Sequence, residues 1–329
     1  MEAHTIPLFH ANGWGRPHTL TYMGGRHVMV KRFDPAALCA LIEREGVTAF
    51  SMVPTMGSAL LQCPELDKHD LSSLEEVMLG ASPLRRLHSW LRSNASWAAR
   101  FCVGYGLTES GPVVAAAYVK STLGKLDDES RIRRQAMTGF AIAGAEMRVV
   151  DVDGVDLPRD GQSIGEILIR SDSVMDGYWN EPEATAAAMD GDWLHTGDMA
   201  VWDEDGYVLI VDRKKDIIIS GGENISSIEI EKTIAAHPAV YECAVIGVPH
   251  EKWGETPRAI VALKPGETLD ADAIRQHVRE HLAGFKVPSQ VDFVPELPKG
   301  ATGKILKRVL REPHWDGREK KVQGAGESA

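Results

Sequence analysis

Residues 101–111 read FCVGYGLTESG, and the fold class can be inferred from this stretch outward. Its first three residues, Phe101, Cys102 and Val103, predict a buried strand. The strand runs directly into the glycine-rich polar turn GYGLTE at residues 104–109. Ligands of α/β sheets bind beyond the carboxyl ends of the strands, so this turn is a candidate binding site.

The residues before this turn alternate between helix and strand patterns. Asp34 and Pro35 are typical of a helix start, because Asp caps free N–H groups and Pro fits the first turn. Gly46 is typical of the helix end. Residues 47–53 and 77–79 are mostly apolar and predict buried strands. We therefore predict an α/β fold class with a mostly parallel sheet.

From about residue 138 the pattern changes to short strands. Strands are predicted at residues 147–150, 165–170 and 208–211, and the turns around them contain Asp-Gly pairs. This pattern is typical of a β-rich subdomain.

The last hundred residues are predicted to form a small α+β unit. Ser226 and Glu229 have the spacing of a capping box, which predicts the start of a helix. Strands are expected at residues 243–248 and 259–263, and a further helix at residues 270–282.

Composition excludes several classes of protein. The chain has 329 residues, with 36 Lys and Arg against 47 Asp and Glu, so its net charge is −11. An acidic chain without a basic run is a poor candidate for binding nucleic acid. The longest apolar run, residues 113–119, is far shorter than the ~18 residues that span a bilayer, so we expect no membrane span. With no signal peptide visible, we expect a cytoplasmic protein.

The cysteines are also informative. None of them has the CxxC spacing of a zinc site, and we expect buried, reduced thiols rather than a disulfide framework. The four are Cys39, Cys63, Cys102 and Cys243.

Five polar side chains in glycine-rich stretches suit nucleotide chemistry. Thr108 can donate a hydrogen bond to a phosphate oxygen, and Glu109 can hold Mg²⁺. In the stretch HTGD, Asp198 can accept from a ribose diol, and Arg213 can make a forked contact with ribose or phosphate. Lys304 is presented by PKGATGK at the start of an amphipathic helix that we predict over residues 303–311.

The order and spacing of these stretches resemble the adenylate-forming (AMP-binding) enzymes, specifically the acyl-CoA synthetases or fatty-acid–CoA ligases. The resemblance runs from residue 7 to about residue 310. It is carried by PLFHANGW, GASPL, GYGLTESGP, GDWLHTGDMA, GYVLIVDRKKDIIISGGENISSIEIE, GVPHEKWGETP and LPKGATGKILKR.

The resemblance implies a particular domain organisation. Residues 1–213 would be the C-terminal portion of a large AMP-binding domain, with its β-rich subdomain at about residues 138–212. Residues 214–316 would be a small, mobile α+β C-terminal domain that pivots at the hinge residue Lys215. A disordered tail would follow at residues 317–329.

The resemblance also implies a two-step reaction. A carboxylic acid reacts with ATP and Mg²⁺ to give acyl-AMP, and CoA then takes the acyl group as a thioester. The motif sequences are most similar to those of enzymes that act on medium- or long-chain fatty acids. Aryl acids remain an alternative substrate class.

The family pattern assigns catalytic roles to three residues. Lys304 would bridge the α-phosphate and the acid, Thr108 would bind phosphate, and Glu109 would bind Mg²⁺. The residues implied to bind ATP or AMP are Gly80, Ala81, Tyr105, Gly106, Thr108, Asp198 and Arg213.

Five further residues receive roles from the same pattern. His10 and Gly104 would lie beside the acyl pocket. Gly221, Gly222 and Glu223 would form the loop that enters the site for thioester formation.

The sequence departs from the family in one respect. The family's phosphate loop, of the type SGTTGxPKG, should precede PLFHANGW, whereas only six residues precede Pro7. We therefore expect this chain to be impaired in adenylation and to associate through uncovered surface. The alternative hypothesis is a truncated, non-catalytic remnant or interaction module.

Overall fold

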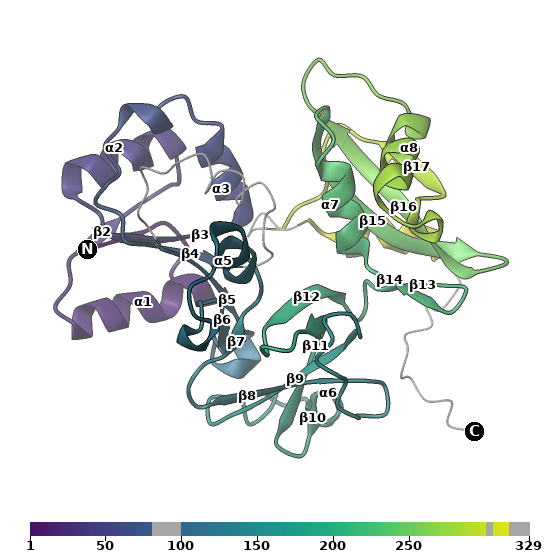
Figure 1. Ribbon diagram of the computed structural model, residues 1–329, viewed down its shortest axis with the longest axis horizontal. Coiled ribbons are helices and arrows are strands. Elements are labelled where there is room, and N and C mark those ends of the chain that lie inside the picture. Colours follow the sequence, from purple (N-terminus) through teal and green to yellow (C-terminus); the bar gives the residue numbers. More distant parts are fainter. Residues whose placement is uncertain (81–99, 301–304, 316–329) are drawn as a thin grey trace. The chain divides into compact units, whose positions relative to one another are not determined.

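The computed structural model describes residues 1–80, 100–300 and 305–315. The chain divides into two compact units (Figure 1). The first comprises residues 1–196 and 200–210, and the second comprises residues 197–199 and the chain from residue 211 onward. None of the described helices is long and apolar enough to cross a membrane.

The first unit contains a seven-stranded sheet with the order β2-β1-β3-β4-β5-β6-β7. Strands β2, β1, β3, β4 and β5 are parallel, and β6 and β7 are antiparallel additions at one edge. The prediction of an α/β fold with a mostly parallel sheet is therefore confirmed. The strands are β1 (Glu2–His4), β2 (His27–Met29), β3 (Ala49–Met52), β4 (Glu76–Gly80), β5 (Arg100–Tyr105), β6 (Ala115–Ala116) and β7 (Phe140–Ala141).

The best-predicted helix of this unit is α2. Asp34 accepts a 2.8 Å hydrogen bond from the Ala37 amide, and Gly46 closes the helix in the left-handed conformation at φ 66°. The buried face of α2 packs into a core centred on Phe50. The helices and short 3₁₀ turns are α1 (Ala11–Tyr22), α2 (Pro35–Glu45), α3 (Pro54–Leu61), α5 (Asp128–Gln135), η1 (Leu66–Lys68), η2 (Thr108–Ser110) and η3 (Ser121–Leu123).

The β-rich part of the chain forms a second sheet with the order β10-β11-β9-β8, and β12 pairs with β11. Asp203 organises the turn between β11 and β12, because its carbonyl accepts from the Gly206 amide at 2.8 Å. Gly206 has φ 75°, a conformation that favours glycine. The elements are β8 (Ala145–Val150), β9 (Gly165–Ser171), α6 (Pro182–Ala188), β10 (Met189–Asp190), β11 (Trp193–Trp202) and β12 (Val208–Arg213).

The second unit contains a sheet with the order β14-β13-β16-β15, and β17 pairs with β16. Ser226 caps α7 as predicted, because its hydroxyl accepts from the Glu229 amide at 3.1 Å. The elements are β13 (Ile218–Ser220), β14 (Glu223–Ile225), α7 (Ser227–Ala235), β15 (Val240–His250), β16 (Gly254–Leu263), α8 (Ala271–His281), η4 (Gly284–Lys286), β17 (Gln290–Phe293), α9 (Lys307–Arg311) and η5 (Glu312–His314).

Strand β15 separates two apolar clusters in this unit. Val245 belongs to the cluster that includes the buried residues of α7 and α8. Its neighbours Ala244 and Ile246 belong to the other cluster, with Leu297 and the partly buried Ile305. This alternation is the period of two that places successive side chains on opposite faces of a strand.

Helix α9 is held by a partly buried polar network. The Lys307 ammonium lies 2.7 Å from Glu231 Oε1 and donates a 2.7 Å hydrogen bond to the Ser227 hydroxyl. Glu231 Oε1 also accepts from the Val245 amide at 2.7 Å. The network therefore joins α9 to α7 and β15.

The prediction of a helix beginning at residue 303 is wrong, because α9 begins at Lys307. Ile305 forms an antiparallel bridge with Lys299, and the Leu306 amide donates to the Pro298 carbonyl at 2.8 Å. These pairings and the packing of Ile305 hold Ile305 and Leu306 outside the helix. The helix predicted around Leu84, Leu87, His88 and Leu91 lies outside the described residues.

Candidate functional site

The candidate site of the first unit lies at the carboxyl edge of the parallel sheet. Gly80 ends β4, and its register partner Gly104 lies near the end of β5. These two glycines therefore sit side by side where a ligand of a parallel α/β sheet binds. Ala81 follows Gly80 but lies outside the described residues.

Close backbone packing shapes the turn after β5. A Cβ atom at Gly106 would lie 1.9 Å from the Pro112 carbonyl oxygen, so only glycine fits there. Ser110 then closes the turn, because its hydroxyl accepts from the Leu107 amide at 2.9 Å. The short 3₁₀ turn η2 consequently presents Thr108 on the surface.

Glu109 is held on both its backbone and its side chain. Its carbonyl accepts from the Met175 amide at 2.8 Å, and its Oε1 accepts from the Tyr178 hydroxyl at 2.9 Å. Burial is the first cause that raises the pKa of Tyr178, and the bond to Glu109 also raises it, so the phenol remains a donor at neutral pH. Tyr178 is a residue that the sequence analysis missed.

The donor set around Glu109 fits Mg²⁺ held largely by a nucleotide. Among the described residues, no group of three or more His, Cys, Asp or Glu side chains could hold a metal ion. Mg²⁺ usually keeps several waters and binds through one or two carboxylates together with substrate phosphates. One carboxylate, on the residue that follows Thr108, fits that mode of binding.

Two further predicted residues of the first unit, Tyr105 and His10, lie at the end of β5 and in the loop after β1. Tyr105 ends β5, is half-buried, and accepts a 2.8 Å hydrogen bond from the Val114 amide through its carbonyl. His10 is half-buried in the loop between β1 and α1, where its amide donates to the Pro7 carbonyl at 3.0 Å.

Two predicted ribose-binding residues lie together in the second unit. Arg213 Nε is 3.2 Å from Oδ1 of the buried Asp198, and the Arg213 side chain is half-exposed. The adjacent backbones are also paired, because the Lys214 amide donates to the Gly197 carbonyl at 2.8 Å. The Asp198 carboxylate and the Arg213 guanidinium are thus held side by side, and the guanidinium is accessible to solvent.

The predicted hinge residue Lys215 is exposed in the turn between β12 and β13. The Lys215 carbonyl accepts a 2.9 Å hydrogen bond from Arg311, whose guanidinium also lies 2.8 Å from Asp216 Oδ1. Helix α9 is therefore tied to this turn.

The predicted thioester loop is a two-residue β-turn. Ser220 pairs with Glu223, and Gly221 and Gly222 connect β13 to β14 with φ values of 60° and 90°. Positive φ at both central positions is the geometry of a type I′ hairpin, which favours glycine. Glu223 is exposed, and Lys304 lies outside the described residues.

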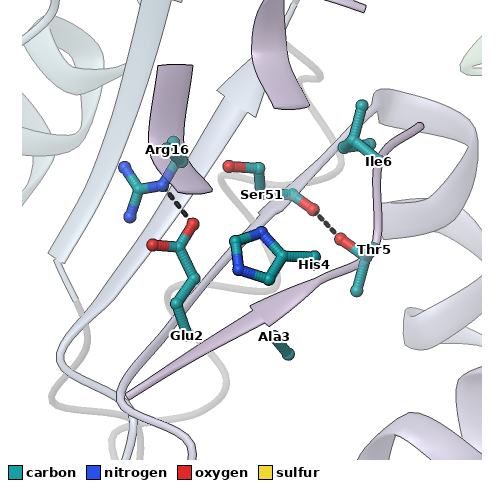
Figure 2. A pocket seen from close by; sticks show the side chains of 7 residues that line it. All are labelled: Glu2, Ala3, His4, Thr5, Ile6, Arg16 and Ser51. Atoms are coloured by element: carbon teal, nitrogen blue, oxygen red, sulfur yellow. Dashed lines mark hydrogen bonds and ion pairs between the residues drawn. The ribbon is translucent and has the colours of Figure 1, made fainter. Parts of the chain in front are cut away.

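A small cavity adjoins the carboxyl end of β1 (Figure 2). Arg16 and Glu2 form an ion pair beside His4, and the Thr5 hydroxyl donates to the Ser51 carbonyl. The buried Ser51 hydroxyl has no hydrogen-bond partner within the described part of the chain. The cavity volume is about 10 Å³, which accommodates a water molecule but no acyl chain.

A parallel sheet with a glycine-rich polar turn beyond the carboxyl end of β5 is typical of α/β proteins that bind a ligand at that edge. The chain belongs to the AMP-binding enzyme family. The model of that family matches residues 2–179, and the model of the AMP-binding enzyme C-terminal domain matches residues 229–304.

Curated relatives with substantial identity include CoA ligases. The chain is 39% identical over 312 residues to a long-chain-fatty-acid–CoA ligase of Thermus thermophilus, a match that covers 94% of this chain and 57% of the relative. It is 41% identical over 318 residues to a peroxisomal butyrate–CoA ligase of Arabidopsis thaliana, covering 94% of this chain and 54% of the relative. The chain therefore spans little more than half the length of these relatives.

Solved structures are similar over nearly the whole chain. The amide bond synthetase McbA from Marinactinospora thermotolerans matches with a TM-score of 0.83 and 33% identity, covering 94% of this chain and 62% of McbA. ATP-bound MatB from Rhodopseudomonas palustris matches with the same TM-score and identity, covering 97% of this chain and 61% of MatB.

Proposed function

We propose that the protein is an ATP-dependent acyl-CoA synthetase. The observation that carries this proposal is the pairing of Asp198 with Arg213, two motif residues whose side chains lie 3.2 Å apart. Family membership and the CoA ligases among the relatives support the same activity.

In the first step, a carboxylate oxygen of the acid attacks the α-phosphorus of ATP. A new oxygen–phosphorus bond forms, the bond to the bridging oxygen breaks, and pyrophosphate leaves. Thr108 would donate to a phosphate, Glu109 would hold Mg²⁺, and Lys304 would place its positive charge beside the α-phosphate and the acid. Mg²⁺ supplies further positive charge to the phosphates, and neutralisation of this kind is a main source of catalysis in phosphate chemistry.

Asp198 and Arg213 would hold the ribose throughout. A carboxylate accepts from both hydroxyls of a diol, and a guanidinium offers a fork of donors in a fixed plane. Because Asp198 is buried and already paired with Arg213, its orientation is set before the nucleotide binds. Gly80, Ala81, Tyr105 and Gly106 would line the adenine slot.

In the second step, the sulfur of CoA attacks the carbonyl carbon of acyl-AMP. A carbon–sulfur bond forms, AMP leaves, and the thiol proton passes to solvent. The loop of Gly221, Gly222 and Glu223 would enter the site for this step, after rotation at Lys215 has withdrawn Lys304. Rotation of a small domain about a short hinge is a recognised means of exchanging catalytic groups.

We propose a medium- or long-chain fatty acid as the substrate and place His10 and Gly104 beside its pocket. The long-chain-fatty-acid–CoA ligase among the relatives supports this assignment, and a relative named trans-cinnamate:CoA ligase keeps aryl acids as the alternative. We also propose a cytoplasmic location, because four free thiols are compatible with a reducing compartment.

Calorimetric titration with AMP tests the ribose contacts. D198N should weaken AMP binding by about 10-fold or more, because it removes a charged acceptor and the ion pair with Arg213. D192N is the matched control, because Asp192 is exposed nearby in the sequence. Equal AMP affinity in D198N and the wild type would contradict the proposed site.

Two assays separate the half-reactions. Pyrophosphate exchange with a panel of fatty and aryl acids reports adenylation, and thioester formation from preformed acyl-AMP and CoA reports transfer. K304A should reduce exchange far more than transfer, because the lysine serves the first step. A chain that binds AMP but performs neither half-reaction would favour the non-catalytic alternative.

A further inference from the structure

The turn that carries Glu109 is fastened to the segment that follows β9. The Ser173 hydroxyl donates to the Ser110 carbonyl at 2.8 Å, and the Met175 amide donates to the Glu109 carbonyl at 2.8 Å. Gly111 allows this approach, because a Cβ atom there would lie 2.6 Å from the Ser173 carbonyl oxygen. The backbone on both sides of Glu109 is thereby fixed.

The backbone of Tyr178 is fixed separately, at the start of α6. Its amide donates to the Thr185 hydroxyl at 2.9 Å, and that hydroxyl donates to the Glu181 carbonyl at 2.9 Å. The Glu181 amide donates in turn to the Tyr178 carbonyl at 3.2 Å. Tyr178 is therefore anchored independently of Glu109, although its phenol reaches that carboxylate.

The contact itself is a single hydrogen bond from a neutral donor. The Tyr178 hydroxyl donates to Glu109 Oε1 at 2.9 Å. Tyr178 is 40% exposed. A phenol restrains a carboxylate without cancelling its charge, in contrast to Lys or Arg. A carboxylate has about four lone-pair sites, so one such bond leaves capacity for a cation.

We propose that Tyr178 is a positioning residue that orients the Glu109 carboxylate for the divalent cation of bound ATP. The inference rests on the proposed role of Glu109 in holding Mg²⁺. Without the phenol, the carboxylate would sample several rotamers, and cation binding would have to restrict them. Tyr178 therefore acts on the affinity for the metal–nucleotide complex rather than on the affinity for AMP.

The test uses Mn²⁺ as a paramagnetic substitute for Mg²⁺. The purified full chain is titrated with Mn²⁺ in the presence of ATP, and free Mn²⁺ is measured by electron paramagnetic resonance. Y178F should weaken Mn²⁺ binding by about 5-fold, the effect of one hydrogen bond, and leave AMP affinity unchanged. W179F is the matched control, because Trp179 is the adjacent aromatic residue and is 89% exposed.

Two further variants extend the test. T185V removes the acceptor for the Tyr178 amide, so it should weaken Mn²⁺ binding in the same direction even if Y178F fails to fold. E109Q removes the charge of the carboxylate itself, so it should weaken Mn²⁺ binding more than Y178F does. A merely structural role for Tyr178 would instead lower the melting temperature of Y178F and leave its Mn²⁺ affinity unchanged.

The outcomes distinguish this proposal from the proposed function. Wild-type Mn²⁺ affinity in Y178F, together with weakened binding in E109Q, would overturn the role of Tyr178 and leave that of Glu109 intact. Unchanged affinity in E109Q, or a wild-type chain that adds nothing to the affinity of free ATP for Mn²⁺, would overturn both.

Discussion

Replacing Lys307 by Met should destabilise the second unit by about 3 kcal/mol at pH 8. The substitution keeps an apolar stem but removes the ammonium 2.7 Å from Glu231 Oε1. Breaking a buried ion pair by removing one partner typically costs 3–5 kcal/mol, because a charge is left buried without compensation. The two side chains are 17% and 19% exposed, so some water reaches them, and we expect the lower end of that range.

The loss of stability caused by K307M should grow as the pH rises. Burial raises the pKa of Glu231, and the charge of Lys307 opposes that increase. Without Lys307 the pKa of Glu231 rises further above its unfolded value of about 4.3. A group whose pKa is raised on folding contributes stability below the unfolded pKa and loses it as pH rises through the folded pKa. K307M should therefore be less destabilised at pH 5 than at pH 8.

Hydrogen exchange measured by mass spectrometry is a suitable assay, because it reports the opening free energy of each segment separately. Peptides from α7 and β15 should lose protection in K307M, and peptides from α2 in the first unit should not. Adding E231Q to K307M should restore part of the loss, because it removes the unpaired charge.

The matched control is R308M. Arg308 lies on the same helix, but its side chain is 78% exposed, so losing its ion pair with Glu312 should cost less than about 1 kcal/mol. Three results would contradict this prediction. K307M could lose no more stability than R308M, its loss of stability could be the same at pH 5 and pH 8, or the stability losses of E231Q and K307M could simply add in the double variant.

Two further results are expected. G106A should lower the melting temperature, at a cost of about 1–3 kcal/mol, because its Cβ would overlap the Pro112 carbonyl oxygen. The control is G104A, whose Cβ would make only an ordinary contact, at 3.8 Å from the Met78 sulfur. Its melting temperature should be close to that of the wild type when both variants are measured by scanning fluorimetry. In timed alkylation at pH 8, Cys63 should react well before the fully buried Cys39, because burial raises the pKa of the Cys39 thiol to about 11. Equal rates of modification for the two thiols would contradict the burial of Cys39.

Features set by neighbouring residues could be predicted from the sequence. The caps of α2 are an example, because Asp34 bonds to an amide three residues away and Gly46 needs only its own backbone freedom. The glycine-rich turn at the end of β5 followed from the apolar run before it.

Features set by distant residues could not be predicted in this way. The sequence from Gly303 to Arg311 is amphipathic, yet Ile305 is drawn into a bridge with Lys299, and the helix starts later. The contact between Tyr178 and Glu109 joins residues 69 positions apart. No local pattern encodes such a contact, because it depends on how the segment after β9 returns to the end of β5.

The two apolar clusters of the second unit have a consequence for partial unfolding. The cluster that contains Leu297 also contains Ala244, Ile246 and Val248 of β15, and residues near the end of the described chain complete it. Trp315 adds a 2.9 Å hydrogen bond to the Gly247 carbonyl. Detachment of this terminal segment would uncover a row of apolar residues on that face of β15. Such an open state would therefore be prone to proteolysis and to aggregation through the exposed sheet.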